Sequence, residues 1–251
     1  MINIFKKILF ISLSLLFTIF LVACGNKLSK EEIINKFVEK SKNIKNMDIV
    51  VNMDLERKTT LNKEGTHQNA LYEVSIIFEP FSMKLNLSLS SLDNVETFIK
   101  DNYFYVKNSK TNEWVREDGK KVIPEFQKVI NNFKLIYDGI KNNIKLIDLS
   151  EKDGNYIIET KDFKNILKEM NIDGLELKLI SEASLRYTVD KKTFLPIDSD
   201  IIIKFDLNHG SKESIAINLK YSNINNVKEI ILPMEVLEAK INNGDKIWKE
   251  I

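Results

Sequence analysis

The chain is poor in the residue types that build catalytic centres, metal sites and flexible linkers. Among its 251 residues are one cysteine and two histidines, so no disulfide can form within the chain and a histidine–cysteine metal centre lacks ligands. Only 8 glycines and 4 prolines occur, and they form no Gly/Ser-rich or Pro-rich hinge. The sequence contains no glycine-rich phosphate loop and no Gly-x-Ser-x-Gly nucleophile motif. We therefore expect one domain after the N-terminal segment, with no catalytic residue, cofactor or metal.

An excess of one charge sign is also absent. The chain has 37 Lys and Arg residues against 36 Asp and Glu residues, and the two signs are interspersed. Residues 1–23 contain Lys6 and Lys7 and no acidic residue, so the chain from residue 24 onward has a net charge of −1. Such a surface has no net field that attracts a polyanion. We expect no nucleic-acid partner.

A long hydrophobic run occurs only at the N-terminus, and it is short for a membrane span. Met1–Lys7 is basic, and Ile8–Ala23 is apolar except for two serines and one threonine. A helix needs about 20 residues to cross a bilayer, and this run has roughly 16. A basic start, an apolar middle and small residues at the end are typical of a secretory signal peptide. We predict that residues 1–23 are such a signal.

This run ends at the single cysteine of the chain. Leu21-Val22-Ala23-Cys24 resembles the bacterial lipobox, which implies a diacylglyceryl group on the Cys24 thiol and cleavage just before Cys24. Two acyl chains are enough for stable membrane attachment. The alternative is an uncleaved anchor helix in which Cys24 is incidental. We expect a lipid anchor that holds the protein on the extracytoplasmic face of the cell membrane.

Little chain separates this anchor from the first expected helix. Residues 24–28 form the predicted lipidated tether, in which the four residues Gly25–Leu28 reach about 14 Å when fully extended. The remaining residues, 29–251, form the predicted domain, which should lie close to the bilayer. This position favours binding or sensing at the adjacent leaflet over carrying cargo away.

Helical periodicity occurs in two long segments and two short ones. Ser29 followed by Glu32 is a capping box, and the apolar stripe after it is interrupted only by Ser41. The second long segment has a strongly apolar face, which we expect to pack on a sheet. Asp162 is placed to cap the third helix. The predicted helices span 30–44, 122–142, 163–170 and 234–240.

Elsewhere the hydrophobic period is two, as in strands with one buried face. The clearest example is 83–89, where Met83, Leu85, Leu87 and Leu89 alternate with polar residues. Short connections predict antiparallel neighbours, and the polar residues 57–69 are interpreted as a turn. We expect an α+β fold built on one large antiparallel sheet. The predicted strands span 47–55, 72–78, 83–89, 95–100, 103–107, 113–116, 145–149, 156–160, 175–180, 183–190, 196–207, 213–222 and 227–232.

Three segments resemble parts of lipoprotein-localisation-factor-like domains. In Tyr187–Ile197 a strand ends in an Asp-containing turn and the next strand begins with Leu-Pro, as in that family. Asn102–Lys107 followed by Trp114-Val115 is similar to a hairpin of small Gram-positive lipoproteins of this class, and Ile231–Pro233 also matches. The similarity in element order spans roughly residues 29–240. It implies a half-open β-barrel, a curved antiparallel sheet with helices on its concave side, which takes acyl chains or other lipids.

Other residues with ligating chemistry are few. His67 and His209 lie in predicted loops, where we interpret them as surface histidines. Asp198 and Asp200 share one strand face and are candidates for a cation or, as we prefer, for the solvent side of the strand. The acidic segment 148–155 lacks calcium-loop spacing and is interpreted as a turn. Five aromatic residues could line a pocket, contact the bilayer interface or pack in the core and in hairpins, and we favour packing in the core and hairpins. They are Tyr103, Phe104, Tyr105, Trp114 and Trp248.

Two functions fit these features. The first is a monomeric, membrane-anchored lipoprotein that binds a hydrophobic, lipid-like ligand in the concavity of the sheet. The second is an envelope interaction or sensor protein that uses the same fold as a ligand-free platform. The two differ in whether the space between sheet and helices is open or is filled by side chains.

Overall fold

The structure, a computed structural model, describes residues 28–59, 64–90, 92–107, 111–170, 176–207 and 210–241. The predicted signal peptide, Cys24, His209 and Trp248 lie outside these residues. Residues 1–33 and residues 34–251 form two separate units. All strands belong to the second unit, which is described here by itself.

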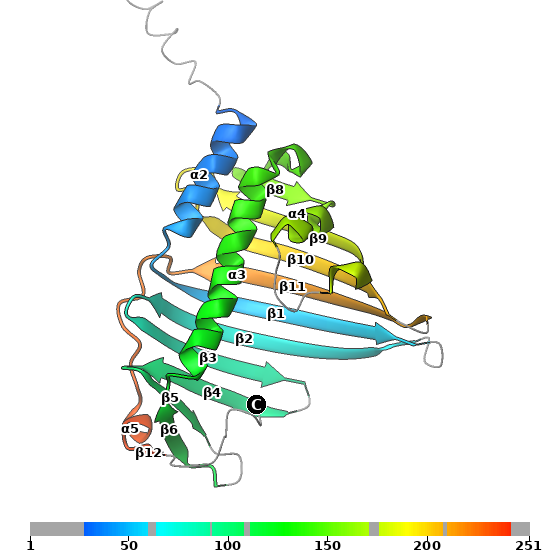
Figure 1. Cartoon of the computed structure of the whole chain (residues 1–251). Coiled ribbons are helices and arrows are strands. Elements are labelled where there is room, and N and C mark those ends of the chain that lie inside the picture. The colour runs from blue at the N-terminus through cyan, green and yellow to red at the C-terminus, as the bar shows by residue number, and fades with distance from the viewer. Residues whose placement is uncertain are drawn as a thin grey trace, which may run out of the picture. The chain divides into compact units, whose positions relative to one another are not determined.

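One curved sheet of twelve strands makes up most of the described chain (Figure 1). The strand order is β12-β6-β5-β4-β3-β2-β1-β11-β10-β9-β8-β7. Every pair is antiparallel except β12 with β6, which is parallel. Within the described residues β12 and β7 form two free edges, so the sheet is a half-open barrel, as expected. The strands are β1 Asn46–Lys58, β2 Thr66–Phe78, β3 Phe81–Leu89, β4 Leu92–Lys100, β5 Tyr103–Lys107, β6 Trp114–Asp118, β7 Asp148–Lys152, β8 Asn155–Thr160, β9 Ile180–Asp190, β10 Pro196–Asp206, β11 Lys212–Ser222 and β12 Lys240–Ile241.

Four α-helices accompany the sheet in the described part of the chain. The longest, α3, crosses in front of the concave face of the sheet (Figure 1), and α4 packs against α3 and β9. The expectation of helices on the concave side is therefore confirmed for these two, and the α+β fold class is correct. The helices are α2 Lys30–Lys42, α3 Val122–Asn142, α4 Phe163–Met170 and α5 Met234–Leu237, with 3₁₀ turns η1 at Ile144–Leu146 and η2 at Leu177–Leu179.

Helix α2 begins with the predicted capping box. The backbone N–H of Ser29 donates to Glu32 Oε2 at 2.8 Å, and the backbone N–H of Glu32 donates to Ser29 Oγ at 3.2 Å. These two bonds satisfy N–H groups that have no partner within a helix. The helix ends at Lys42, two residues before the predicted end, where the side-chain amide of Asn43 donates to the Glu39 carbonyl at 2.9 Å.

Strand register sorts the side chains onto two faces. Ile49 of β1 lies between Tyr221 of β11 and Val74 of β2, and Val74 lies opposite Leu85 of β3. The apolar rows of these four strands therefore share one face, the face crossed by α3. Close to β4, β5 and β6 this face is filled by a core cluster. Its buried members are Met83, Ile99, Phe104, Val106 and Val122.

The opposite face of β4, β5 and β6 is covered by the C-terminal segment. Ile230 and Leu232 pack with Phe98 and Trp114 in a second buried cluster, to which Val236 of α5 also belongs. The predicted strand at 227–232 is therefore wrong. Val227, Ile230 and Leu232 are apolar because they contact this cluster, and the segment joins the sheet only at β12. The three aromatic residues Phe104, Tyr105 and Trp114 thus pack in the core, as favoured from the sequence.

Three predicted boundaries differ from the structure. Residues 57–69 are not all turn, because Arg57 of β1 still pairs with Thr66 of β2. Both strand ends are exposed there, so they need no apolar alternation. The separate strand predicted at 175–180 is replaced in its described part by η2, in which the N–H of Leu179 donates to the Glu176 carbonyl, and β9 starts at Ile180. The strand predicted at 145–149 begins at Asp148, after η1.

The predicted turns lie where the sequence places them. Asp153 and Gly154 both have positive φ, 50° and 77°, as a two-residue hairpin turn requires. At the end of β9 the carboxylate of Asp190 accepts hydrogen bonds from the backbone N–H groups of Lys192 and Thr193 and from the Thr193 hydroxyl. This Asp turn joins β9 to β10, which begins at Pro196, in the order expected from the family resemblance.

Candidate functional site: an apolar cavity beneath helix α3

The space between α3 and the centre of the sheet is not filled by side chains. It contains a cavity of about 330 Å³, a volume at the lower end of the range for small-molecule sites. The lining comes from the end of α2, from one face of α3, and from the concave face of four strands. These lining residues are Ser41, Ile44, Met47, Ile49, Val51, Met53, Tyr72, Val74, Ile76, Phe78, Met83, Leu85, Phe126, Val129, Ile130, Phe133, Lys134, Tyr137, Leu219 and Tyr221.

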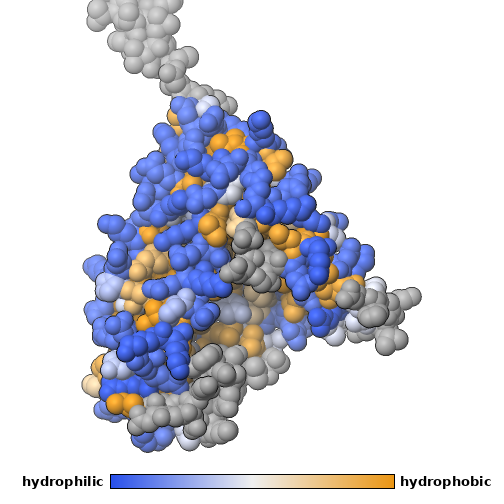
Figure 2. Space-filling model, viewed as in Figure 1, coloured by the Kyte–Doolittle hydropathy of each residue, from blue (hydrophilic) through white to orange (hydrophobic). Residues whose placement is uncertain are grey.

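Burial along the strands follows this cavity. Ile99 and Phe104, on the concave face near the sheet edge, are buried, whereas Ile49, Val51 and Val74 at the sheet centre are only half-buried. Apolar residues at the centre of a sheet are normally enclosed, because protein interiors pack at the density of organic crystals. Here they face open space instead. Figure 2 shows a hollow with an apolar floor over β2 and β3, beside the N-terminal half of α3.

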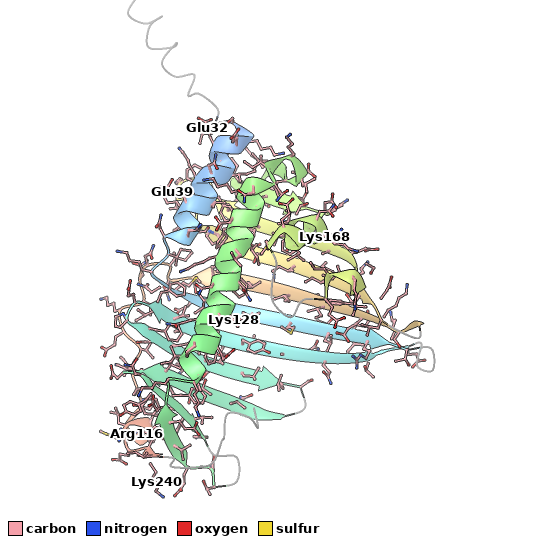
Figure 3. The ribbon with its side chains drawn as sticks, in the orientation of Figure 1. Glu32, Glu39, Arg116, Lys128, Lys168 and Lys240 are labelled. Carbon is pink, nitrogen blue, oxygen red and sulfur yellow. The ribbon has the colours of Figure 1, made fainter. Side chains whose placement is uncertain are left out.

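Helix α3 spans the cavity because it is fixed at its two ends. Val122 belongs to the filled core cluster at the N-terminal end, and Ile136, Tyr137 and Ile140 are buried at the C-terminal end. Between these contacts Val129 is 54% exposed, and Val129, Ile130 and Phe133 line the cavity. Lys128 lies on this middle stretch (Figure 3). The expected packing of the apolar face on the sheet is therefore found at the two helix ends, and the cavity separates helix and sheet between them.

A glycine brings the C-terminal end of α3 close to α4. A Cβ atom at Gly139 would lie 2.7 Å from Cγ2 of Ile166 and 3.0 Å from the sulfur of Met170. Both distances are shorter than ordinary van der Waals contacts, so only glycine permits this approach. The close packing of the two helices fixes the end of α3 above the cavity.

Four of the five polar side chains of the lining lie at one end, and the fifth, Tyr72, lies on β2 opposite Val51. Ser41 of α2 lies at that end with Tyr137 of α3, Tyr221 of β11 and, at the rim, Lys134. The ring of Phe37 meets that of Tyr137 edge to face at 5.7 Å and lies 5.0 Å from that of Tyr187. The remaining wall is almost wholly apolar. The cavity is therefore amphipathic, with a hydroxyl-rich end and an apolar body.

Burial keeps the phenols of this end neutral. It raises the pKa of Tyr137 to about 12, although the neighbouring hydroxyls of Ser41 and Tyr187 oppose part of the rise. Burial, together with Tyr137 and Tyr221, also raises the pKa of Tyr187. The ring of Tyr221 is half-buried, but burial at its hydroxyl, which lies 3.0 Å from Ser199 Oγ, raises its pKa as well. All three phenols are hydrogen-bond donors at neutral pH.

A second hollow, of about 910 Å³, lies across eight strands and is more polar. Asp148 alone comes from β7, whereas each of the other seven strands contributes a run of three consecutive residues, such as Asn52, Met53 and Asp54, of which two face away from α3. At its centre Asp200 accepts a hydrogen bond from Asn218 at 2.8 Å and lies 3.7 Å from Arg186. The cavity beneath α3 has the more continuous apolar wall and is the better candidate for an apolar ligand.

The residues singled out from the sequence lie away from this cavity. His67 is on β2 rather than in a loop, exposed between Asp54 at 3.8 Å and Glu56 at 3.7 Å. Asp198 and Asp200 are on the face opposite Ile201, as preferred from the pattern. No group of three or more metal-ligating side chains occurs in the part of the chain that the structure describes. Cys24 and His209 lie outside that part, and the 148–155 segment is the β7–β8 hairpin.

Sequence reasoning did not single out Ser41, Tyr137 or Tyr221 as site residues. One signal was present, because Ser41 is the single polar residue on the apolar stripe of its helix. The two tyrosines carry no such signal, since aromatic residues at these periods are common in any core.

Comparison with known proteins gives a family and a set of similar structures. The profile of a family described as "Family of unknown function (DUF6612)" matches residues 29–241. The chain belongs to this family. No curated protein matches its sequence. Among solved structures, the lipoprotein LppX from Mycobacterium tuberculosis has 11% identity and a TM-score of 0.45, over 80% of this chain and 98% of that one. A LolA superfamily protein from Nitrosomonas europaea has 10% identity and a TM-score of 0.25, over 84% and 97%.

None of the helices in the part of the chain that the structure describes is long and apolar enough to cross a bilayer.

Proposed function

We propose that this protein binds a hydrophobic, lipid-like molecule in the cavity beneath α3 while attached to the extracytoplasmic face of the cell membrane through a diacylglyceryl group on Cys24. The observation that carries the proposal is the cavity itself, about 330 Å³ with a nearly continuous apolar wall at the centre of the sheet. A platform protein without a ligand has no use for this space, and leaving it empty sacrifices packing energy.

Energetics favour an apolar occupant. Transfer of apolar surface from water is worth about 25 cal/mol for each Å² buried, on both the ligand and the wall. The half-buried side chains of Ile49, Val51 and Val74 supply such surface, and Phe133 of α3, which is 40% exposed, supplies more. An occupant that covers these side chains completes the core between α3 and the sheet.

The membrane attachment rests on the sequence and is part of the same proposal. With a four-residue tether after Cys24, a reach of about 14 Å brings the domain next to lipids that can supply a ligand. This arrangement fits exchange with the adjacent leaflet rather than transport over a distance.

The test is photo-crosslinking in isolated membranes that carry the full chain. A photoreactive hydrocarbon probe is added without the cofactors for acyl transfer, and labelled peptides are mapped by mass spectrometry. We expect label in the 126–137 stretch of α3 and in β1. Labelling confined to the N-terminal segment, or spread without preference, contradicts the proposal.

A matched pair of variants separates cavity binding from surface adsorption. Val51→Phe places a larger side chain in the cavity, whereas Val50→Phe makes the same change on the opposite face of β1. Val51→Phe should reduce labelling of the 126–137 peptide about fivefold or more, and Val50→Phe should leave it unchanged. Equal effects of the two variants contradict binding in the cavity.

A further inference from the structure

One buried polar group at the hydroxyl-rich end of the cavity has no partner. The Oγ atom of Ser41 makes no hydrogen bond of ordinary geometry, although the Tyr137 hydroxyl is close enough for Ser41 to lower the pKa of that phenol, and the residue is only 5% exposed. An unsatisfied buried hydroxyl costs about 1–3 kcal/mol, so nearly all such groups in proteins are bonded. Ser41 is also part of the cavity wall. A ligand atom at this end of the cavity would supply the well-formed hydrogen bond that Ser41 does not make to the nearby Tyr137 hydroxyl.

The neighbours of Ser41 define what kind of group fits there. The phenols of Tyr137 and Tyr221 are neutral, and they can donate hydrogen bonds as well as accept them. The one cation of the lining, Lys134, is exposed at the rim, with its ammonium 5.8 Å from the centre of the Phe78 ring. No buried positive charge among the lining residues is present to offset an anion at this end. Burying an unpaired carboxylate is far more costly than burying a neutral oxygen.

We propose that the ligand is a single-chain amphiphile with a neutral oxygen head, a hydroxyl or a carbonyl, which hydrogen-bonds to Ser41 beside Tyr137 while its chain fills the apolar body of the cavity. This proposal rests on the proposed function, because it assigns the ligand class of the same cavity. The volume of about 330 Å³ supports one chain rather than several, as it lies at the lower limit for ligand sites.

The head-group assignment is tested with three probes of equal chain length. The full lipidated chain is placed in phosphatidylcholine–phosphatidylglycerol vesicles with photoreactive dodecanol, dodecanoic acid or dodecane, each at the same mole fraction in the membrane. We expect dodecanol to label the 126–137 peptide about five times more than dodecane, and more than dodecanoic acid. One hydrogen bond to a buried group accounts for a factor of this size.

Ser41→Ala identifies the partner. This variant should lower dodecanol labelling about fivefold and leave dodecane labelling unchanged. Thr97→Val is the matched control, because Thr97 Oγ1 is another buried hydroxyl without a partner but is not part of the cavity wall. It should change neither probe. Thermal unfolding of both variants checks that they fold.

The outcomes separate this proposal from the proposed function. If dodecanol and dodecane label the cavity equally and Ser41→Ala changes neither, the cavity binds apolar chains and the head-group assignment is wrong. If dodecanoic acid labels most and Lys134→Met abolishes the preference, the head is anionic and the assignment is likewise wrong. If no probe labels the cavity peptides, both proposals fail.

Discussion

The hydroxyl of Tyr221 on β11 lies 3.0 Å from the hydroxyl of Ser199 on β10, although these two residues are not opposite each other in the sheet. The register places Ser199 opposite Leu219, so Tyr221 reaches diagonally to the neighbouring row. Tyr187, the partner of Ser199 on β9, lies in that row as well. The diagonal contact brings the tyrosine hydroxyls together and confines the polar part of the cavity to one end.

This tyrosine cluster predicts a loss of stability at alkaline pH. Burial raises the pKa of Tyr137 to about 12, so the unfolded chain releases the phenol proton first. The stabilisation is complete below pH of about 10 and is lost as the pH rises towards the folded-state pKa. The free energy of unfolding, measured with urea at pH values from about 8 to about 11, should fall as the pH rises. The fall should be smaller in Tyr137→Phe. Equal falls in the two proteins would show that Tyr137 does not contribute.

The cavity predicts that extra volume is tolerated in the wall but not in the packed core. Ile49→Phe adds a ring beside open space and should change the free energy of unfolding by less than about 1 kcal/mol. Ile158, which is 1% exposed, offers the matched site in a filled region. Ile158→Phe should destabilise by about 1–3 kcal/mol. Similar losses at both positions, measured by urea unfolding, would mean that the space beneath α3 is not open in solution.

The close approach of α3 and α4 predicts that Gly139→Ala is destabilising. Alanine is normally favoured over glycine within a helix by about 1 kcal/mol. Here its Cβ would lie 2.7 Å from Cγ2 of the buried Ile166, and the resulting strain should outweigh that gain, for a net loss of about 1 kcal/mol or more. Ile166→Leu removes the β-branch and should restore part of the stability in the double variant. A gain in stability from Gly139→Ala alone would contradict the contact.

The capping box of α2 predicts a modest loss in Ser29→Ala. This variant loses the acceptor for the Glu32 N–H, and such changes cost about 1 kcal/mol. Ser29→Asp keeps a side-chain acceptor and should retain most of the stability. Thermal unfolding of the two variants distinguishes a cap from a general effect of substitution at residue 29, since a general effect would lower both melting temperatures equally.

The lipobox resemblance predicts that processing depends on the Cys24 thiol. Cys24→Ser should leave an uncleaved precursor that takes up no radiolabelled acyl chain, because a hydroxyl is a much weaker nucleophile than a thiolate. Electrophoresis of labelled cells measures both features at once. Normal cleavage and labelling of the variant would overturn the assignment of residues 1–23 as a lipoprotein signal peptide.

Much of the architecture was predictable because it depends on local periodicity. The alternation of Met83, Leu85 and Leu87 identifies one face of β3, and the apolar stripe of 122–142 gives α3 its bounds. The same reasoning failed at 227–232, where the apolar residues Val227, Ile230 and Leu232 contact a cluster and do not pair in a ladder. Periodicity reports which side chains are covered, and it does not report what covers them.

The sequence by itself determined the half-buried strands, the long amphipathic helix, the capped start of α2 and the tight hairpin turns. Each of these features depends on residues that are close together in the sequence, which is why the sequence alone predicts it. Only the tertiary structure decided that α3 is fixed at its ends and stands off the sheet between them. Val129 and Phe133 have the same helical spacing whether the space beneath them is open or filled, and the hydroxyl of Ser41 has no partner only because of where α2, α3 and β11 meet. The cavity depends on the distances between helices and strands, and a hydrophobic pattern in the sequence does not report those distances.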